Sequence, residues 1–145
     1  MKQTVKPTAA FFMSIVSALA AVIAIAFTVK SSTYSYKMAH ETQILVTLVV
    51  AAVLFIASAV AASKLPEVVL DVIRLAALIA VGVSFSYIFT DRTSLIGFTY
   101  FSSLAAGNAA AMDAMNAALV AMVCQIVAMV LTSVSGFFSL KPRKA

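Results

Sequence analysis

The sequence predicts an all-α membrane protein, an antiparallel bundle of four transmembrane helices. Of its 145 residues, 63% are hydrophobic and only 10% are charged, whereas soluble domains are about half apolar and a quarter charged. The apolar residues form four runs, each long enough to cross a hydrocarbon core of about 30 Å, which needs about 20 helical residues. Short links make successive helices antiparallel neighbours in one domain over 1–145. The runs cover approximately 8–29, 43–63, 66–89 and 107–140.

The first run, 8–29, follows two lysines and carries small or hydroxyl residues spaced alternately by four and three positions. This spacing places them on one face of a helix. The face comprises Ala10, Ser14, Ser17, Ala21, Ala24, Thr28 and Ser31. A signal peptide is the alternative, because 18–20 and 24–26 resemble small-residue cleavage sites. The run is longer than a signal-peptide core, so we expect it to be retained as a helix.

The second and third runs are separated only by the turn 64–66. The run 43–63 has no charge and many β-branched residues, but an open sheet cannot satisfy its backbone in lipid, so we predict a helix. Pro66 suits the first position of the third helix. Asp71 lies near that helix's N-terminus, where the helix dipole favours anions. Arg74, three residues further on, is expected to form a local ion pair with it.

The link 90–106 is the longest in the chain and is not purely polar. Leucine, isoleucine and aromatic residues punctuate it. This pattern favours a short amphipathic helix that lies along the membrane interface.

The fourth run, 107–140, carries an uninterrupted heptad seam of small or hydrogen-bonding residues. In lipid, small residues let helix backbones approach, and polar side chains bond across the interface. We therefore predict that the first and fourth helices meet through their seams. The Gln125 side chain is expected to form a hydrogen bond with Ser17 or with a neighbouring carbonyl. We also expect Ser17 to lie at about the same depth in the membrane as Gln125 or Ala121. The fourth seam comprises Gly107, Ala111, Ala114, Ala118, Ala121, Gln125, Ala128, Thr132, Ser135 and Ser139.

The lysines and arginines predict the orientation. Seven fall on the side that holds both termini, and Lys30, Lys37 and Arg92 fall on the other. Because positive residues accumulate in cytoplasmic loops, we predict a multi-pass plasma-membrane protein with both termini in the cytoplasm.

Chemical groups for catalysis are sparse. His40 is the only histidine, and Glu41, Asp91 and Asp113 are expected at the same end of the bundle, but no motif assembles them. One cysteine, Cys124, cannot form a disulfide framework, and the isolated glycines form no phosphate-binding loop. We therefore predict no catalytic, metal or cofactor-binding residues. The basic residues flank apolar runs, which argues against nucleic-acid binding.

Two polar residues near the start of the fourth helix accompany Asp113. Asn108 precedes it and Asn116 follows one turn later. We interpret these residues as a solvated helix end, with a polar vestibule as the alternative.

These observations lead to a functional hypothesis that involves no chemical reaction. We expect a small non-enzymatic integral membrane protein that acts as an accessory or assembly subunit of a membrane complex or as a homo-oligomer. Its partners would be the lipid bilayer and another membrane protein or a second copy. The alternative is a small transporter or channel for a neutral or lipophilic solute, with an enzyme third.

Overall fold

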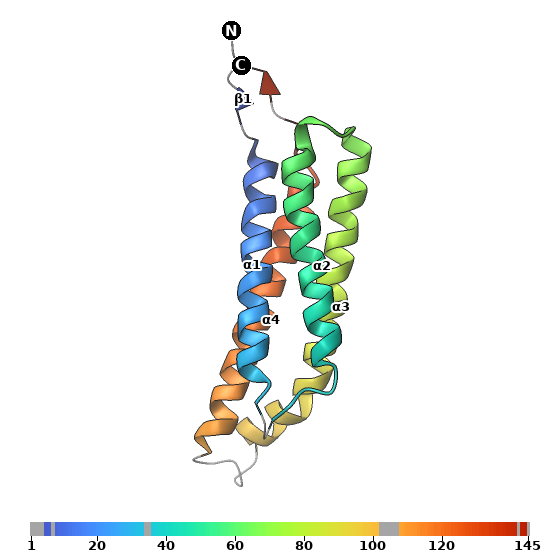
Figure 1. The fold of residues 1–145 in the computed structure, drawn as a ribbon. Coiled ribbons are helices and arrows are strands. Elements are labelled where there is room, and N and C mark those ends of the chain that lie inside the picture. The colour runs from blue at the N-terminus through green and yellow to red at the C-terminus, as the bar shows by residue number, and fades with distance from the viewer. Residues whose placement is uncertain (1–4, 7, 34–35, 102–107, 142, 145) are drawn as a thin grey trace.

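The computed structural model describes residues 5–6, 8–33, 36–101, 108–141 and 143–144. Its four α-helices are α1 (Ala9–Ser31), α2 (Glu41–Val60), α3 (Glu67–Phe101) and α4 (Ala109–Ser135) (Figure 1). One 3-10 turn, η1 (Ala61–Ser63), extends α2. Each of the four helices is long and apolar enough to span a membrane. The predicted all-α bundle of four helices is therefore confirmed.

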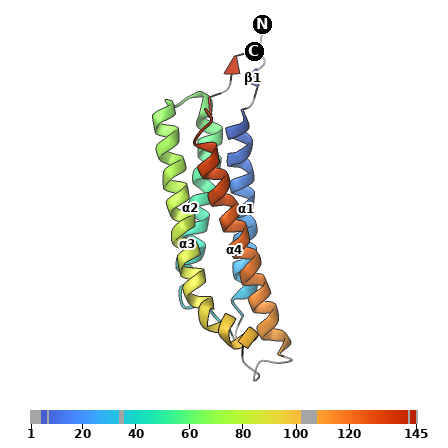
Figure 2. The same ribbon diagram turned by 180° about the vertical axis from the view of Figure 1, so that it is seen from behind.

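The helices pack in a ring that follows the chain order. Each contacts the next, and α1 closes the ring by packing against α4, which is the most extensive helix pair in the described residues. Figures 1 and 2 show α4 running alongside α1 and crossing it. Both chain ends lie at the same end of the bundle, where the short strands β1 (Val5–Lys6) and β2 (Arg143–Lys144) pair antiparallel. We call this the terminal end, and the other the loop end.

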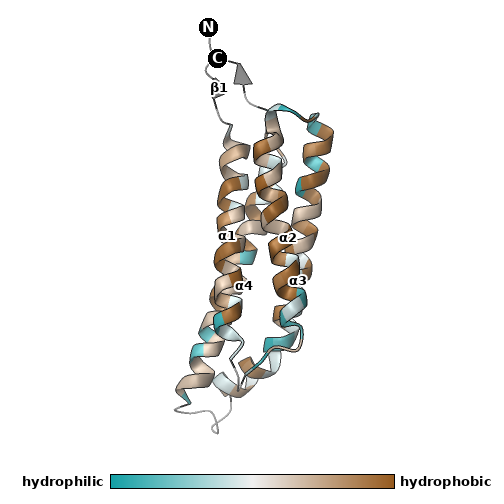
Figure 3. Cartoon of the chain, in the orientation of Figure 1, coloured by the Kyte–Doolittle hydropathy of each residue, from teal (hydrophilic) through white to brown (hydrophobic). Residues whose placement is uncertain are grey.

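Residue size divides the interior. Between α1 and α4 the buried positions are mainly alanine and serine, which permits close approach of the two backbones. Larger buried side chains, including Phe55, Leu48 and Ile88, fill the space beside α2 and α3. Valine, leucine, isoleucine and phenylalanine dominate the outward faces, and hydrophilic residues gather mostly toward the two ends (Figure 3).

Local sequence explains where the helices begin. The Thr8 hydroxyl accepts from the Phe11 amide at 3.4 Å, and the Asn108 side-chain oxygen accepts from the Ala111 amide at 3.1 Å. These contacts satisfy amides that lack an intrahelical partner. At the start of α3, the Pro66 carbonyl accepts from two amides of the first turn.

The third helix is longer than predicted. It does not stop near residue 89 but continues to Phe101 as part of α3, 35 residues in all. The expectation of a separate helix along the interface was wrong for residues 90–101, and 102–107 lie outside the described residues. The reason is that the helical burial period persists through Arg92, Leu95 and Thr99, with no proline to interrupt it. The last turns curve beneath the bundle (Figure 1).

Candidate functional site

Polar side chains occupy three levels inside this apolar bundle. One lies near the terminal end, one at the middle and one near the loop end. In hydrocarbon, an unpaired polar group costs several kcal/mol, so the hydrogen bonds at each level show which groups are committed to holding the helices together.

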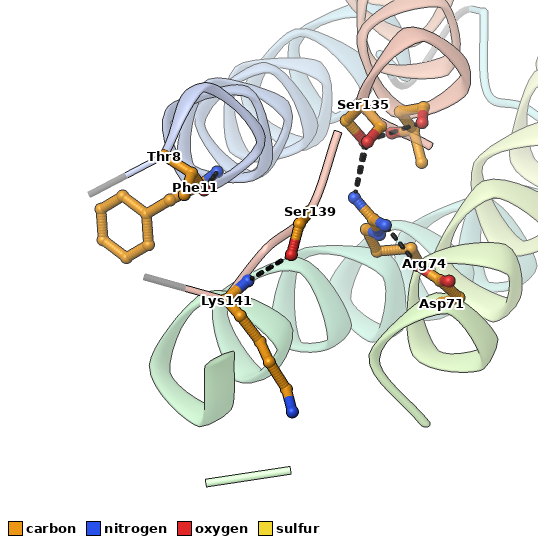
Figure 4. A network of polar contacts seen from close by, with 8 residues as sticks. Thr8, Phe11, Asp71, Arg74, Ser135, Ser139 and Lys141 are labelled. Carbon is orange, nitrogen blue, oxygen red and sulfur yellow. Dashed lines mark hydrogen bonds and ion pairs between the residues drawn. The ribbon is translucent and has the colours of Figure 1, made fainter. Parts of the chain in front are cut away.

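At the terminal end, Arg74 joins α3 to α4. Its side chain is 4% exposed, and its guanidinium donates to the Ser135 carbonyl at 2.8 Å. The same group pairs with Asp71, one turn earlier on α3. This confirms the predicted Asp71–Arg74 ion pair and adds a second partner on another helix (Figure 4).

At the loop end, Arg92 joins α3 to α1. The side chain is 3% exposed, and its guanidinium donates to the Ser31 carbonyl at 2.6 Å. The Ser31 hydroxyl in turn donates to the Ala114 carbonyl of α4 at 2.7 Å. Ser31 therefore connects three helices at one point.

The two arginines play equivalent parts at opposite ends. Ser135 is the last residue of α4 and Ser31 is the last residue of α1. Each arginine therefore brings a positive charge to the C-terminus of another helix, where the macrodipole is negative. They are 18 positions apart in the sequence, which corresponds to about 27 Å along a helix. That separation is close to the hydrocarbon thickness of about 30 Å, so in a membrane the arginines would lie at its two boundaries.

Sequence analysis missed both interhelical roles. Arg74 was assigned only a local ion pair, and Arg92 was placed in a link. The available signal in the sequence was helical spacing. Arg74 shares one helical face with Leu70 and Ala77, and Arg92 shares one with Ile88. The structure buries these faces of α3. A charge on the apolar face of a spanning helix points to an internal partner.

A second set of polar and aromatic contacts lies at the loop end, beside Arg92 in the sequence. His40 Nδ1 lies 2.7 Å from Asp91 Oδ1, and the His40 backbone amide donates to Asp91 Oδ2 at 2.8 Å. The His40 ring stacks on Tyr87, with 4.9 Å between centroids. Asn108 donates to the Tyr36 hydroxyl at 2.9 Å. These contacts fasten the α1–α2 connection to α3 through His40 and to the start of α4 through Tyr36.

Each end of the bundle also has a shallow cleft. The cleft at the terminal end, about 300 Å³, lies between α3 and α4 and includes Arg74 and Thr132. The cleft at the loop end, about 370 Å³, includes Arg92 and Tyr36. Both arginines thus line a cleft while bonding another helix.

The structure places the two predicted seams inside the bundle. The described members of both seams are buried from Ala10 to Ser31 on α1 and from Ala111 to Ser135 on α4. Ser139 is exposed beyond α4, and Gly107 lies outside the described residues. The buried set includes Ser14, Ser17, Ala21, Ala24, Ala114, Ala118, Ala121, Gln125, Ala128 and Thr132.

The register between α1 and α4 differs from the predicted one. Ser31 on α1 bonds Ala114 on α4. Ser17 lies fourteen positions before Ser31, and Ala128 lies fourteen positions after Ala114. Since the helices are antiparallel, Ser17 lies level with Ala128, about one turn from Gln125 and two turns from Ala121. The predicted pairing of Ser17 with Ala121 was wrong, because heptad spacing fixes the face but not the offset along it.

Gln125 also lacks its predicted hydrogen bond. The side chain is fully buried, yet neither its oxygen nor its nitrogen has a partner within the described part of the chain. The Ser17 hydroxyl is likewise without a partner. A bond between the two is therefore absent from this structure.

Few of the described side chains with catalytic chemistry lie close together. His40 and Asp91 form a base and an orienting carboxylate, but no described hydroxyl or thiol bonds the histidine ring. Across the described ranges, no group of three His, Cys, Asp or Glu side chains converges to hold a metal. Asp113 and Asn116 are exposed on the first turns of α4. Comparison with protein-family models, curated proteins and solved structures gave no match.

Proposed function

We propose that this chain is a non-enzymatic, multi-pass plasma-membrane protein that works as an accessory or assembly subunit or as a homo-oligomer. Both termini face the cytoplasm in this proposal, which rests on the excess of lysine and arginine at the terminal end. The buried arginines support a membrane setting because their separation matches the thickness of the hydrocarbon core.

The observation that carries the proposal is the outward face of α3. Only 28% of its apolar span is buried, against 39% for each of the other three helices. Gly82 and the exposed Ser86 lie one turn apart on this helix, between the two arginines. A side chain added at Gly82 would meet open space. Small residues at membrane depth allow another helix to approach closely, whereas the α1 and α4 seams already face each other.

Substitution of Ser86 by leucine tests the proposal. The variant fills the outward face of α3 without disturbing the bundle, because Ser86 is exposed. Ala57→Leu is the matched control, since Ala57 is exposed at membrane depth on α2. We expect Ser86→Leu to reduce recovery of the partner, or of a second copy, in mild detergent, and Ala57→Leu to preserve it. Equal recovery from both variants would argue against α3 as the contact face.

Transport of a neutral solute is the second candidate, and the unpartnered Gln125 favours it. A fully buried amide without a hydrogen bond is unusual, and a solute could supply its partners. If Gln125 contacts a solute, Gln125→Ala should abolish uptake while the oligomeric state remains unchanged. A subunit role predicts no such loss.

A further inference from the structure

Gln125 is not the only unpartnered polar group at the middle of the bundle. The hydroxyl of Ser84, on α3, is fully buried and has no hydrogen-bond partner in the described residues. The same holds for Ser14 and Ser17 on α1, which are 2% and 0% exposed. Three helices therefore direct neutral, unsatisfied groups into the interior.

The packing register places Ser84 and Gln125 at the same level. Val81 and Ala128 belong to one core cluster, and Ile88 and Ala121 belong to another. Ser84 follows Val81 by three positions, and Gln125 precedes Ala128 by three. Because α3 and α4 are antiparallel, these offsets bring the two polar side chains to one depth. Ser17, level with Ala128, lies about one turn nearer the terminal end.

The charges of the protein lie too far away to bond these groups. Arg74 is ten positions from Ser84 along α3, and Arg92 is eight positions from it. These offsets correspond to about 15 Å and 12 Å along the helix axis. Within the described part of the chain, the level of Gln125 is therefore a neutral region between two charged ends, and an ion would find no described counter-charge there.

At this depth, a primary amide and a hydroxyl together offer both donors and acceptors. This chemistry suits a small neutral molecule that can both donate and accept. Buried water typically makes about three hydrogen bonds to otherwise unsatisfied groups. We propose that water binds at the level of Gln125 and Ser84 and bridges the two side chains.

A series of polar residues leads from the cleft at the terminal end toward this site. The cleft lining includes Thr132, which lies seven positions from Gln125, about two turns along the same face of α4. Ser14 and Ser17 occupy the intervening levels on α1. Polar groups thus extend from the cleft to the middle of the bundle. Water would bind there whether the chain is a subunit or a transporter.

Water-edited solid-state NMR on the wild-type protein in lipid bilayers tests the proposal. With ¹⁵N-labelled glutamine, the Gln125 side-chain amide should receive magnetisation from water, and its peak is assigned by its loss in Gln125→Met. The amide of Gln43, exposed at the start of α2, is the positive control. Transfer to Gln43 without transfer to Gln125 would overturn the proposal.

Thermal unfolding of variants provides an independent test. If water bridges the side chains, Gln125→Met and Ser84→Ala should each lower the Tm, and the double variant should lower it by less than the sum, because both substitutions remove the same bridge. In a dry site each change would instead remove an unpaired group and raise the Tm. Ser58→Ala is the control, since the buried Ser58 hydroxyl bonds within its own helix; it should show no coupling to Gln125→Met. A raised Tm for either single variant would contradict the bridge.

Discussion

Replacement of Arg92 by methionine should destabilise the bundle by removing its fastening at the loop end. Arg92 is 3% exposed, and its guanidinium donates at 2.6 Å to the carbonyl of Ser31, the last residue of α1. Methionine keeps a long apolar stem but cannot donate. Among the described residues, the Ser31 carbonyl would retain the Thr33 amide alone, and the C-terminus of α1 would lose its nearby cation.

The expected magnitude is a balance of three effects. A hydrogen bond from a charged group contributes about 1.5–3 kcal/mol, and a cation at a helix C-terminus adds about 0.3–1 kcal/mol. Against this, Arg92 Nε is buried without a partner in the described residues, and relieving such a group returns about 1–3 kcal/mol. We therefore expect a net loss of about 1 kcal/mol, which corresponds to a fall in Tm of about 2–4 °C for a chain of this size.

The assay is thermal unfolding of the purified protein in mild detergent, followed by circular dichroism. Thr93→Met is the matched control, because Thr93 is the next residue on α3 and is exposed. It should change the Tm by no more than about 1–2 °C, since exposed substitutions usually fall within about 0.5 kcal/mol. If Arg92→Met were as stable as the control, the bond to Ser31 would not contribute net stability, and the reasoning would be refuted.

Three further predictions concern the α4 seam, the register between α1 and α4, and the membrane topology. Ala121→Leu should lower stability by about 1–3 kcal/mol through overpacking of the fully buried seam, while Val123→Leu, 58% exposed, should be neutral; equal Tm shifts would count against the seam. In a Cys124→Ser background, cysteines at Ser17 and Ala128 should crosslink more readily than cysteines at Ser17 and Ala121, and the reverse order would mean that the register is wrong. In the same background, an impermeant thiol reagent on intact cells should label a cysteine at Ser94 but not one at Lys141, and the opposite result would invert the proposed topology.

The sequence predicted the parts of the fold that depend on local patterns. Four apolar runs of sufficient length specify spanning helices, because hydrocarbon leaves the backbone few alternatives. Heptad spacing of small residues, such as Ala114, Ala118 and Ala121, indicated which face of α4 would be suited to close packing. Both inferences need only the chain's own periodicity.

Features that depend on two helices at once could not be predicted in this way. The offset between Ser17 and α4 is set by packing along the full length of the helices and by the bond from Ser31 to Ala114. Arg74 and Arg92 reach the neighbouring helices by donating to backbone carbonyls, which any residue could supply and which no motif marks. The unpartnered state of Gln125 likewise emerges only when the surrounding helices are in place.

The central claim is that this bundle functions through association with another membrane protein or a second copy. The most direct test is the mass of the particle released from native membranes by mild detergent, measured by native mass spectrometry. We expect a stoichiometric complex larger than one chain of 15.2 kDa. A single chain, recovered alone in every mild detergent that preserves its folded state, would contradict the account.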